Sequence, residues 1–111
     1  MTPKVSIILA NYNEEKYIAE AIESVINQTY TNWELIIIDD ASTDRSQDII
    51  NSYKDSRIKT RFCKKNNHVA YASNLGIDMA IGEYIAKIDS DDVWEAEKLE
   101  KQVLFMEEHT E

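Results

Sequence analysis

The stretch that decides the fold is WELIIIDD, residues 33–40. Residues 33–38 form a nearly continuous apolar run, which is typical of a strand covered on both faces in a parallel sheet. The run stops at Asp39 and Asp40, residue types that favour loops over strand interiors. A buried strand that leads directly into two carboxylates predicts an α/β protein with polar chemistry at its strand ends.

Similar elements lie on both sides of this strand. Strands are expected at residues 5–10, 33–38, 58–62 and 84–88, with helices at about 14–28, 44–53, 69–80 and 95–108. Strand and helix therefore alternate four times, and connections this short predict a parallel sheet with right-handed crossovers. We expect an α/β fold: a Rossmann-like, mostly parallel sheet with flanking helices and the spatial order 3-2-1-4.

Several residues predict where the helices begin, end and bury their side chains. Asn13 is a candidate N-cap for the first helix, and Asp44 with Gln47 has the spacing of a capping box. Gly82 is expected to end the third helix. The last helix is expected to bury Leu99, Val103 and Met106.

Length and charge restrict the function. The 111 residues allow a single domain, residues 1–111, and the net charge of −9 argues against a nucleic-acid partner. An acidic chain would also repel a phosphorylated ligand unless a cation intervened. No apolar run reaches the roughly 20 residues of a membrane span, and the single Cys63 fits a reducing cytoplasm. We expect a cytoplasmic protein, although a longer parent could be membrane-associated.

Polar residues gather at one predicted edge of the sheet. Ligands of such folds bind beyond the carboxyl ends of the strands, where the strand order reverses. Mn²⁺ or Mg²⁺ would suit the carboxylates there and would let an acidic protein hold a diphosphate. Each motif alone has a simpler explanation, such as a turn or a helix cap, and the prediction depends on their joint placement. The residues are Asn11-Tyr12-Asn13, Asp39-Asp40, the loop before the third helix and Asp89-Ser90-Asp91-Asp92.

Four blocks of the sequence, in order, closely resemble glycosyltransferase family 2. They are residues 5–13, 24–30, 33–44 and 82–94. The resemblance implies a GT-A fold, a nucleotide-diphosphate sugar as donor, a divalent metal and inversion at the anomeric carbon. It also implies transfer to an acceptor such as a cell-surface polysaccharide, while the sugar itself stays open.

The resemblance assigns roles to particular positions. Ala10 and Tyr12 match positions that hold the base, and Asp40, with Asp39 beside it, matches the acceptor of a hydrogen bond from uracil. Asp91 matches a residue that faces the ribose and diphosphate. The metal-binding region comprises Asp89, Asp91 and Asp92, and either of the last two could ligate the ion.

The chain departs from the family pattern in four respects. Ala10 stands where many relatives have Pro or Thr, and Ser73 replaces a basic residue that contacts the diphosphate or the base. The candidate substitutes for that contact are Lys64, Lys65 and His68, which stands in place of a glycine. The alternative for His68 is a solvated loop residue. Family domains are also about twice as long, so we expect a truncated domain whose general base lies beyond Glu111. Such a fragment should bind donor, transfer little sugar, and self-associate through its truncated edge.

Two other classes of protein share some of these features. A receiver-type signalling domain also has an acidic magnesium pocket, but its acidic pair should end the first strand, where this chain has Asn11. A non-catalytic binding module that has kept the fold without the activity is the other alternative.

Overall fold

The computed structural model describes residues 2–109, and for Val69 the backbone only. A single four-stranded sheet has the order β3-β2-β1-β4 with every pair parallel, which confirms the predicted topology. The chain alternates strictly between strand and helix. The elements are β1 (Val5–Asn11), α1 (Ile18–Ile26), β2 (Trp33–Asp39), α2 (Ser46–Asn51), β3 (Ile58–Phe62), α3 (Val69–Met79), β4 (Tyr84–Lys87) and α4 (Lys98–Glu108).

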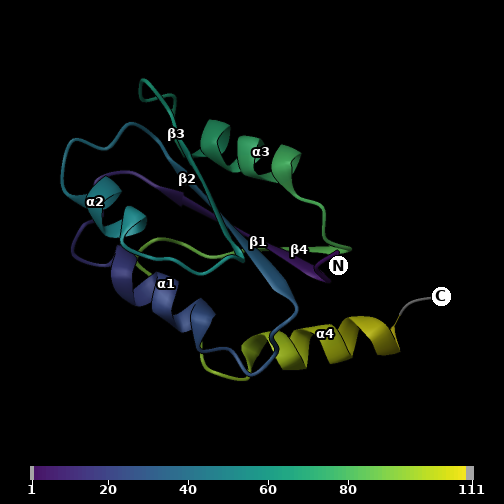
Figure 1. The fold of residues 1–111 in the computed structure, drawn as a ribbon. Coiled ribbons are helices and arrows are strands. Elements are labelled where there is room, and N and C mark those ends of the chain that lie inside the picture. Colours follow the sequence, from purple (N-terminus) through teal and green to yellow (C-terminus); the bar gives the residue numbers. More distant parts are fainter. Residues whose placement is uncertain (1, 110–111) are drawn as a thin grey trace.

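The helices cover the sheet on both faces, as Figure 1 shows: α3 lies on one side, and α1, α2 and α4 lie on the other. Alternate residues of each central strand point to opposite faces. Ile7 and Leu9 belong to the larger apolar cluster with α1, whereas Ile8 packs with Ala72 of α3. Both faces of β1 and β2 are therefore core, which explains the continuous apolar runs.

Helix α3 lies unusually close to β1. A methyl group added at Gly76 would stand 2.5 Å from Cγ2 of Ile8, well inside van der Waals contact. Glycine at this position therefore allows the helix and the strand to pack together.

The amino end of the sheet is held by one buried carboxylate. Glu34, 2% exposed, accepts hydrogen bonds from the Ser6 hydroxyl and from Ile81 N–H, and its other oxygen accepts from Lys59 Nζ at 2.6 Å. Burial acts to raise the pKa of Glu34, but these hydrogen bonds outweigh it and leave the pKa below its ordinary value. Glu34 therefore stays charged and joins β1, β2, β3 and the connection before β4.

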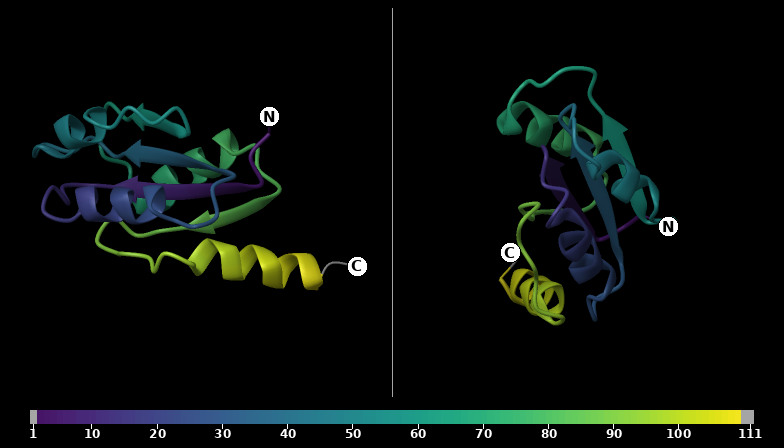
Figure 2. Two further views of the ribbon diagram at one scale, coloured as in Figure 1. Left: turned by 60° about the horizontal axis from the view of Figure 1, so that its bottom comes forward. Right: turned by 90° about the vertical axis from the view of Figure 1, so that its left-hand side faces the viewer.

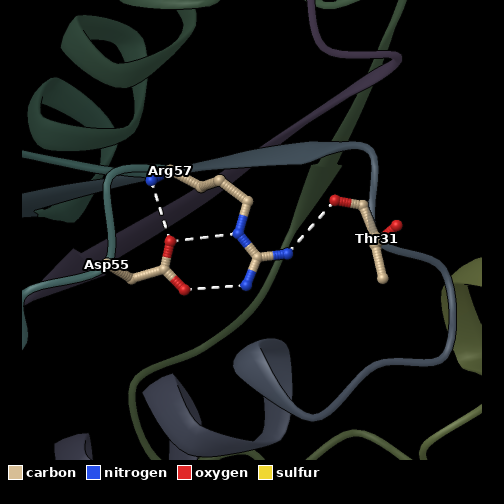
Figure 3. A network of polar contacts seen from close by, with 3 residues as sticks. All are labelled: Thr31, Asp55 and Arg57. Atoms are coloured by element: carbon tan, nitrogen blue, oxygen red, sulfur yellow. Dashed lines mark hydrogen bonds and ion pairs between the residues drawn. The ribbon is translucent and has the colours of Figure 1, made fainter.

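A second polar contact fixes the start of β3, as Figure 3 shows. The Arg57 guanidinium donates to both oxygens of Asp55, at 3.0 and 2.7 Å, and to Thr31 O at 3.1 Å. The same guanidinium lies 3.8 Å from the ring centroid of Trp33. This arrangement ties the loop before β2 to the loop before β3.

The N-cap predicted for α1 is wrong, and the capping box predicted for α2 does not form. Helix α1 begins at Ile18 rather than Glu14, because Asn13 adopts φ 53° and uses its side chain to bind the loop after β2. Asp44 and Gln47 do not form a capping box, since Gln47 Nε2 donates to Asp39 instead. Asp44 Oδ1 still accepts a hydrogen bond from the N–H of Ser46, the first residue of α2, at 2.9 Å.

Two predictions for the later helices are also wrong. Helix α3 ends at Met79, before Gly82, and Gly82 N–H instead donates to the Ser6 hydroxyl at 2.8 Å. Helix α4 begins at Lys98 and buries Leu99 and Val103 as predicted, but Met106 is 43% exposed. No helix within residues 2–109 is long and apolar enough to cross a membrane.

Candidate functional site

Backbone hydrogen bonds join the carboxyl ends of β1, β2 and β3. The left-hand view of Figure 2 shows the strand arrowheads pointing to the same side of the molecule. Asp40 N–H donates to Asn11 O at 2.8 Å, and Cys63 N–H donates to Asp39 O at 2.8 Å. The backbone just beyond β1, β2 and β3 is thereby fixed in register, so the loops that follow start from defined positions.

The carboxylate of Asp39 is saturated by the protein. It is fully buried and accepts hydrogen bonds from Asn11 Nδ2 at 2.9 Å and from Gln47 Nε2 at 2.9 Å. Ser42 donates to it twice, through its N–H at 2.9 Å and its hydroxyl at 2.7 Å. Four donors compensate the buried charge, so Asp39 needs no cation and acts to position the loops around it.

Asp40 differs from Asp39 because one of its carboxylate oxygens has no hydrogen-bond partner in the described part of the chain. It is 1% exposed, and its Oδ1 accepts from Asn67 N–H at 3.0 Å. Its Oδ2 is buried and has no hydrogen-bond partner among residues 2–109. A buried carboxylate oxygen without a donor is costly, and such an atom indicates a missing partner.

The loop before α3 encloses Asp40. Besides the Asn67 contact, Asn66 Nδ2 donates to Asp40 O at 3.4 Å. The half-buried Cys63 thiol lies close enough to feel this charge: burial raises its pKa, and Asp40 raises it further. The thiol is therefore protonated at neutral pH.

Asn13 joins the loops after β1 and β2. Its Oδ1 accepts from Thr43 N–H at 2.8 Å and from Asp44 N–H at 3.2 Å, while its own N–H donates to the Ser42 hydroxyl. The Asp44 side chain also accepts a hydrogen bond from Glu15 N–H, at 3.1 Å. Sequence reasoning assigned Asn13 and Asp44 to helix capping, and it included Asn13 and the loop before α3 in the polar edge without giving Asn66 or Asn67 a contact. The tolerance of asparagine for left-handed backbone was the signal that could have indicated a loop role for Asn13.

Asp89, Asp91 and Asp92 lie in a turn after β4, closed by Asp92 N–H donating to Asp89 O at 3.0 Å. All three side chains are exposed, and Asp92 Oδ1 accepts from Val93 N–H at 3.0 Å. Within residues 2–109, no protein group donates to the carboxylates of Asp89 or Asp91. Nor do three or more His, Cys, Asp or Glu side chains in that range gather as a metal site would require.

The donor set of this turn still fits a hard divalent cation. Mg²⁺ and Mn²⁺ commonly use one or two carboxylates and take the remaining ligands from water and phosphate oxygens. The exposed oxygens of Asp91 and Asp92 meet that requirement, whereas the saturated Asp39 does not. The sequence predicted that the carboxylates of several strand ends would share one cation, whereas among them only those of this turn have exposed oxygens to bind it.

The other predicted site residues surround the same edge. Ala10 is half-buried and packs against the cluster of Ile8 and Ala72, while Tyr12 is 40% exposed just beyond β1. His68 is exposed at the N-terminus of α3, with φ 85° and ψ 154°, a backbone conformation close to glycine-only. Which of these residues contact a ligand stays a prediction.

Comparison with known proteins identifies the family. The sequence model described as Glycosyl transferase family 2 matches residues 6–111. The chain belongs to glycosyltransferase family 2. This confirms the resemblance and rules out the receiver-type alternative.

Individual relatives agree with the assignment. The putative teichuronic acid biosynthesis glycosyltransferase TuaG of Bacillus subtilis is 43% identical over 97% of this chain and 44% of its own length. The UDP-Glc:alpha-D-GlcNAc-diphosphoundecaprenol beta-1,3-glucosyltransferase WfaP of Escherichia coli is 50% identical over 93% of this chain and 41% of its own length. The chain therefore spans less than half the length of these relatives.

A solved structure supports the GT-A fold. The crystal structure of S. aureus TarS residues 1–349 in complex with UDP superposes with a TM-score of 0.90 at 32% sequence identity. The match covers 96% of this chain and 32% of TarS. A complex of the same TarS fragment with UDP-GlcNAc gives a TM-score of 0.88. The predicted GT-A architecture is confirmed.

Proposed function

We propose that this chain binds the nucleoside diphosphate of a UDP-sugar at the carboxyl end of its sheet, as the donor-binding part of an inverting glycosyltransferase. The acceptor we propose is a cell-surface polysaccharide or its lipid-linked precursor, in line with the names of TuaG and WfaP. The complexes of TarS with UDP and UDP-GlcNAc support uracil as the base.

The observation that carries the proposal is the unpartnered Oδ2 of Asp40. Uracil has one imino N–H, and a carboxylate oxygen held in place by the protein is its natural acceptor. Because Oδ1 is already fixed by Asn67 N–H, the side chain is oriented before the base arrives. Binding would satisfy a buried acceptor that the protein alone leaves unsatisfied, and this adds to affinity. Since Oδ2 is buried, the groups that cover it must move for the base to reach it.

The remaining residues would act around this hydrogen bond. Ala10 would contact the base through its backbone, the exposed ring of Tyr12 would stack on it, and Asp39 would hold the loops. His68 would contribute positive or hydrogen-bonding character near the diphosphate. Asp91 would face the ribose and diphosphate, and Asp91 or Asp92, with Asp89 in the same turn, would hold Mn²⁺ or Mg²⁺. When bound, that cation would neutralise negative charge on the leaving diphosphate.

Transfer requires groups outside this site. A general base must lie within hydrogen-bond reach of the acceptor hydroxyl. We propose that it belongs to the part of the relatives that this chain does not span. The 111-residue chain would then bind donor and transfer little or no sugar.

Calorimetric titration of the chain with UDP in the presence of Mn²⁺ tests the proposal. Asp40→Asn keeps an oxygen for Asn67 N–H but puts an amide donor opposite the imino group, so we expect a loss of at least about tenfold in affinity. Asp48→Asn, an exposed carboxylate on α2, is the matched control and should bind like the wild type.

Two further measurements separate the base contact from the metal. EDTA, or the substitution Asp92→Ala, should weaken UDP binding while leaving uridine binding unchanged, whereas Asp91→Ala should weaken UDP binding more than uridine binding. Absence of UDP binding to the wild type, or equal affinity for wild type and Asp40→Asn, would contradict the proposal. Affinity indifferent to EDTA would remove the metal and leave the base contact intact.

A further inference from the structure

The loop after α1 contains a buried polar side chain that takes no part in the nucleotide site described above. Gln28 is 4% exposed, and its Nε2 donates to Glu95 O at 2.7 Å and to Ser24 O at 3.1 Å. Its Oε1 accepts a hydrogen bond from Leu99 N–H at 2.9 Å. The amide therefore joins the end of α1 to the segment that leads into α4, and Figure 1 shows these two parts of the chain beside each other.

The first turn of α4 depends on this contact. The first N–H groups of a helix have no partner within the helix, and Leu99 is the second residue of α4. Glu97, at the N-cap position, makes no capping hydrogen bond through its side chain within residues 2–109. The Gln28 amide supplies the acceptor that a capping side chain would otherwise provide. A residue 71 positions away along the chain thus fixes where α4 begins.

Thr29 adds a second connection between the same two segments. Its N–H donates to Ala96 O at 2.9 Å, and its hydroxyl donates to Glu100 Oε2 at 2.7 Å. The backbone of residues 95–99 is therefore held by hydrogen bonds to two consecutive residues of the loop after α1. Both amide hydrogens of Gln28 are used in these contacts with the protein, so Gln28 can act on a ligand only through the segment that it holds.

That segment is the direct continuation of the acidic turn after β4. Only two residues separate Asp92 from Glu95. The turn begins after Ile88, which is 3% exposed and hydrogen-bonded to β1, and it ends at Trp94, which is 7% exposed in the larger apolar cluster. Burial thus holds the turn at both ends, and Gln28 adds a polar hold where the chain leaves it.

We propose that Gln28 is a positioning residue for the cation site. It fixes the chain beyond the Asp89–Asp92 turn, so that Asp91 and Asp92 present their oxygens in one arrangement before a cation arrives. This inference rests on the proposed binding of Mn²⁺ or Mg²⁺ by that turn. Small hard cations require near-octahedral ligands, and a turn that must be ordered on binding would hold them more weakly. Residues behind the ligands commonly tune metal affinity in this way.

Calorimetric titration with UDP at several Mn²⁺ concentrations tests the inference. Gln28→Met keeps the length of the side chain and removes all three hydrogen bonds. The Mn²⁺ concentration needed for half-maximal UDP binding should rise at least about tenfold, and uridine affinity should fall by less. Gly82→Ala, which crowds Ser6 at the amino end of the sheet, is the matched control for lost stability. It should leave the Mn²⁺ requirement at the wild-type value.

Hydrogen exchange of the unliganded chain tests the positioning without a ligand. The amides of residues 89–99 should exchange faster in Gln28→Met, while those of β1 and β2 should change less. Thr29→Val is a milder variant of nearly the same shape, and it carries the test if Gln28→Met does not fold. It removes the hydroxyl contact with Glu100 and should raise both the exchange rate and the Mn²⁺ requirement by a smaller factor. Circular dichroism verifies that each variant is folded.

The outcomes separate this inference from the proposed function. If the wild type needs Mn²⁺ for UDP binding but the folded variants have the same requirement, the positioning role is overturned and the cation site stands. An equal rise in Gly82→Ala, or an equal loss of uridine and UDP affinity, would also overturn it, because Gln28 would then act on stability alone. If the wild type binds UDP without Mn²⁺, the proposed cation site itself fails and this inference fails with it.

Discussion

The two ends of the sheet hold buried carboxylates in opposite conditions. At the amino end, Glu34 receives donors from Ser6, Lys59 and Ile81 on both of its oxygens. At the carboxyl end, Asp39 is likewise saturated, but the adjacent Asp40 keeps one buried oxygen without a partner among residues 2–109. A buried charge that is fully paired serves the fold, whereas an unpaired one beside it indicates a ligand.

Buried carboxylates of this protein should therefore differ in what they contribute, some to the stability of the fold and one to nucleotide binding. Substitutions at Glu34 and Asp39 should act mainly on the free energy of unfolding. Substitution at Asp40 should act mainly on nucleotide affinity. The expected change in stability decreases from Asp39, through the amino end of the sheet, to the loop before α3.

The largest change is expected for Asp39→Ala. It leaves the buried Asn11 amide and three other donors without their acceptor, and each unsatisfied group costs about 1–3 kcal/mol before relaxation. Because Gln47 and Ser42 can turn toward water, we expect a total loss of about 3–4 kcal/mol in the free energy of unfolding. Urea denaturation followed by circular dichroism measures it. A loss below about 1 kcal/mol would show that the network contributes little.

Gly82→Ala should have the next largest effect, at the amino end. The added methyl carbon would stand 2.7 Å from Ser6 N and Oγ and 2.9 Å from Val5 C, so the connection before β4 must move. Overpacking of this kind costs about 1–3 kcal/mol. Thermal unfolding should show the loss, and UDP affinity should stay at the wild-type value because the site lies at the other end. A change in affinity as large as the change in stability would contradict the separation.

The sequence predicted the sheet almost completely, because long apolar runs at Val5–Ala10 and Trp33–Ile38 have few alternative interpretations. It failed where a side chain had two possible partners. Asn13 and Gln47 each carried a valid capping signal, and tertiary contacts with Thr43 and Asp39 prevailed. Local spacing cannot reveal contacts that depend on how β1 and β2 lie beside each other.

The sequence predicted which residues form the candidate site, but not which of their carboxylate oxygens lack a hydrogen-bond partner. The sequence placed Asp39 and Asp40 at the correct edge, yet the two residues are of one type and adjacent in the chain. Only the folded structure distinguishes the saturated carboxylate from the one with a free oxygen. Asn67 could not be foreseen as a contact, because its backbone N–H, rather than its side chain, binds Asp40.

Lowering the pH should reveal how much Glu34 contributes to the free energy of unfolding. Its folded-state pKa lies below the ordinary value of 4.5, so its stabilisation is present above that pH and is lost as the pH falls through the folded-state pKa. We expect the free energy of unfolding of the wild type to fall more steeply below about pH 4.5 than that of Glu34→Gln. Urea denaturation at several pH values measures both slopes. Parallel slopes would indicate that Glu34 titrates alike in the folded and unfolded chains.

The smallest expected change in stability has the opposite sign and lies beside the binding site. His68 adopts φ 85° and ψ 154°, a conformation that costs a residue with a side chain about 1–3 kcal/mol. Glycine relieves that strain but loses about 0.5–1 kcal/mol through the greater freedom of the unfolded chain. Because the relief of strain exceeds this entropic loss, His68→Gly should stabilise the protein by about 1 kcal/mol. Thermal unfolding of the variant beside the wild type measures the gain.

The effect of His68→Gly on UDP affinity tests whether the strained backbone at His68 serves to place its imidazole against the diphosphate. If the imidazole contacts the diphosphate, the more stable variant should bind UDP several-fold more weakly and bind uridine with unchanged affinity. His68→Ala keeps the strain and removes the imidazole, so it should weaken UDP binding equally without stabilising the fold. Unchanged UDP affinity in both variants would mean that only the backbone at this position matters, since it carries Asn66 and Asn67 to Asp40. In that case the contacts of Asn66 and Asn67 with Asp40, rather than the imidazole of His68, would join α3 to the nucleotide site.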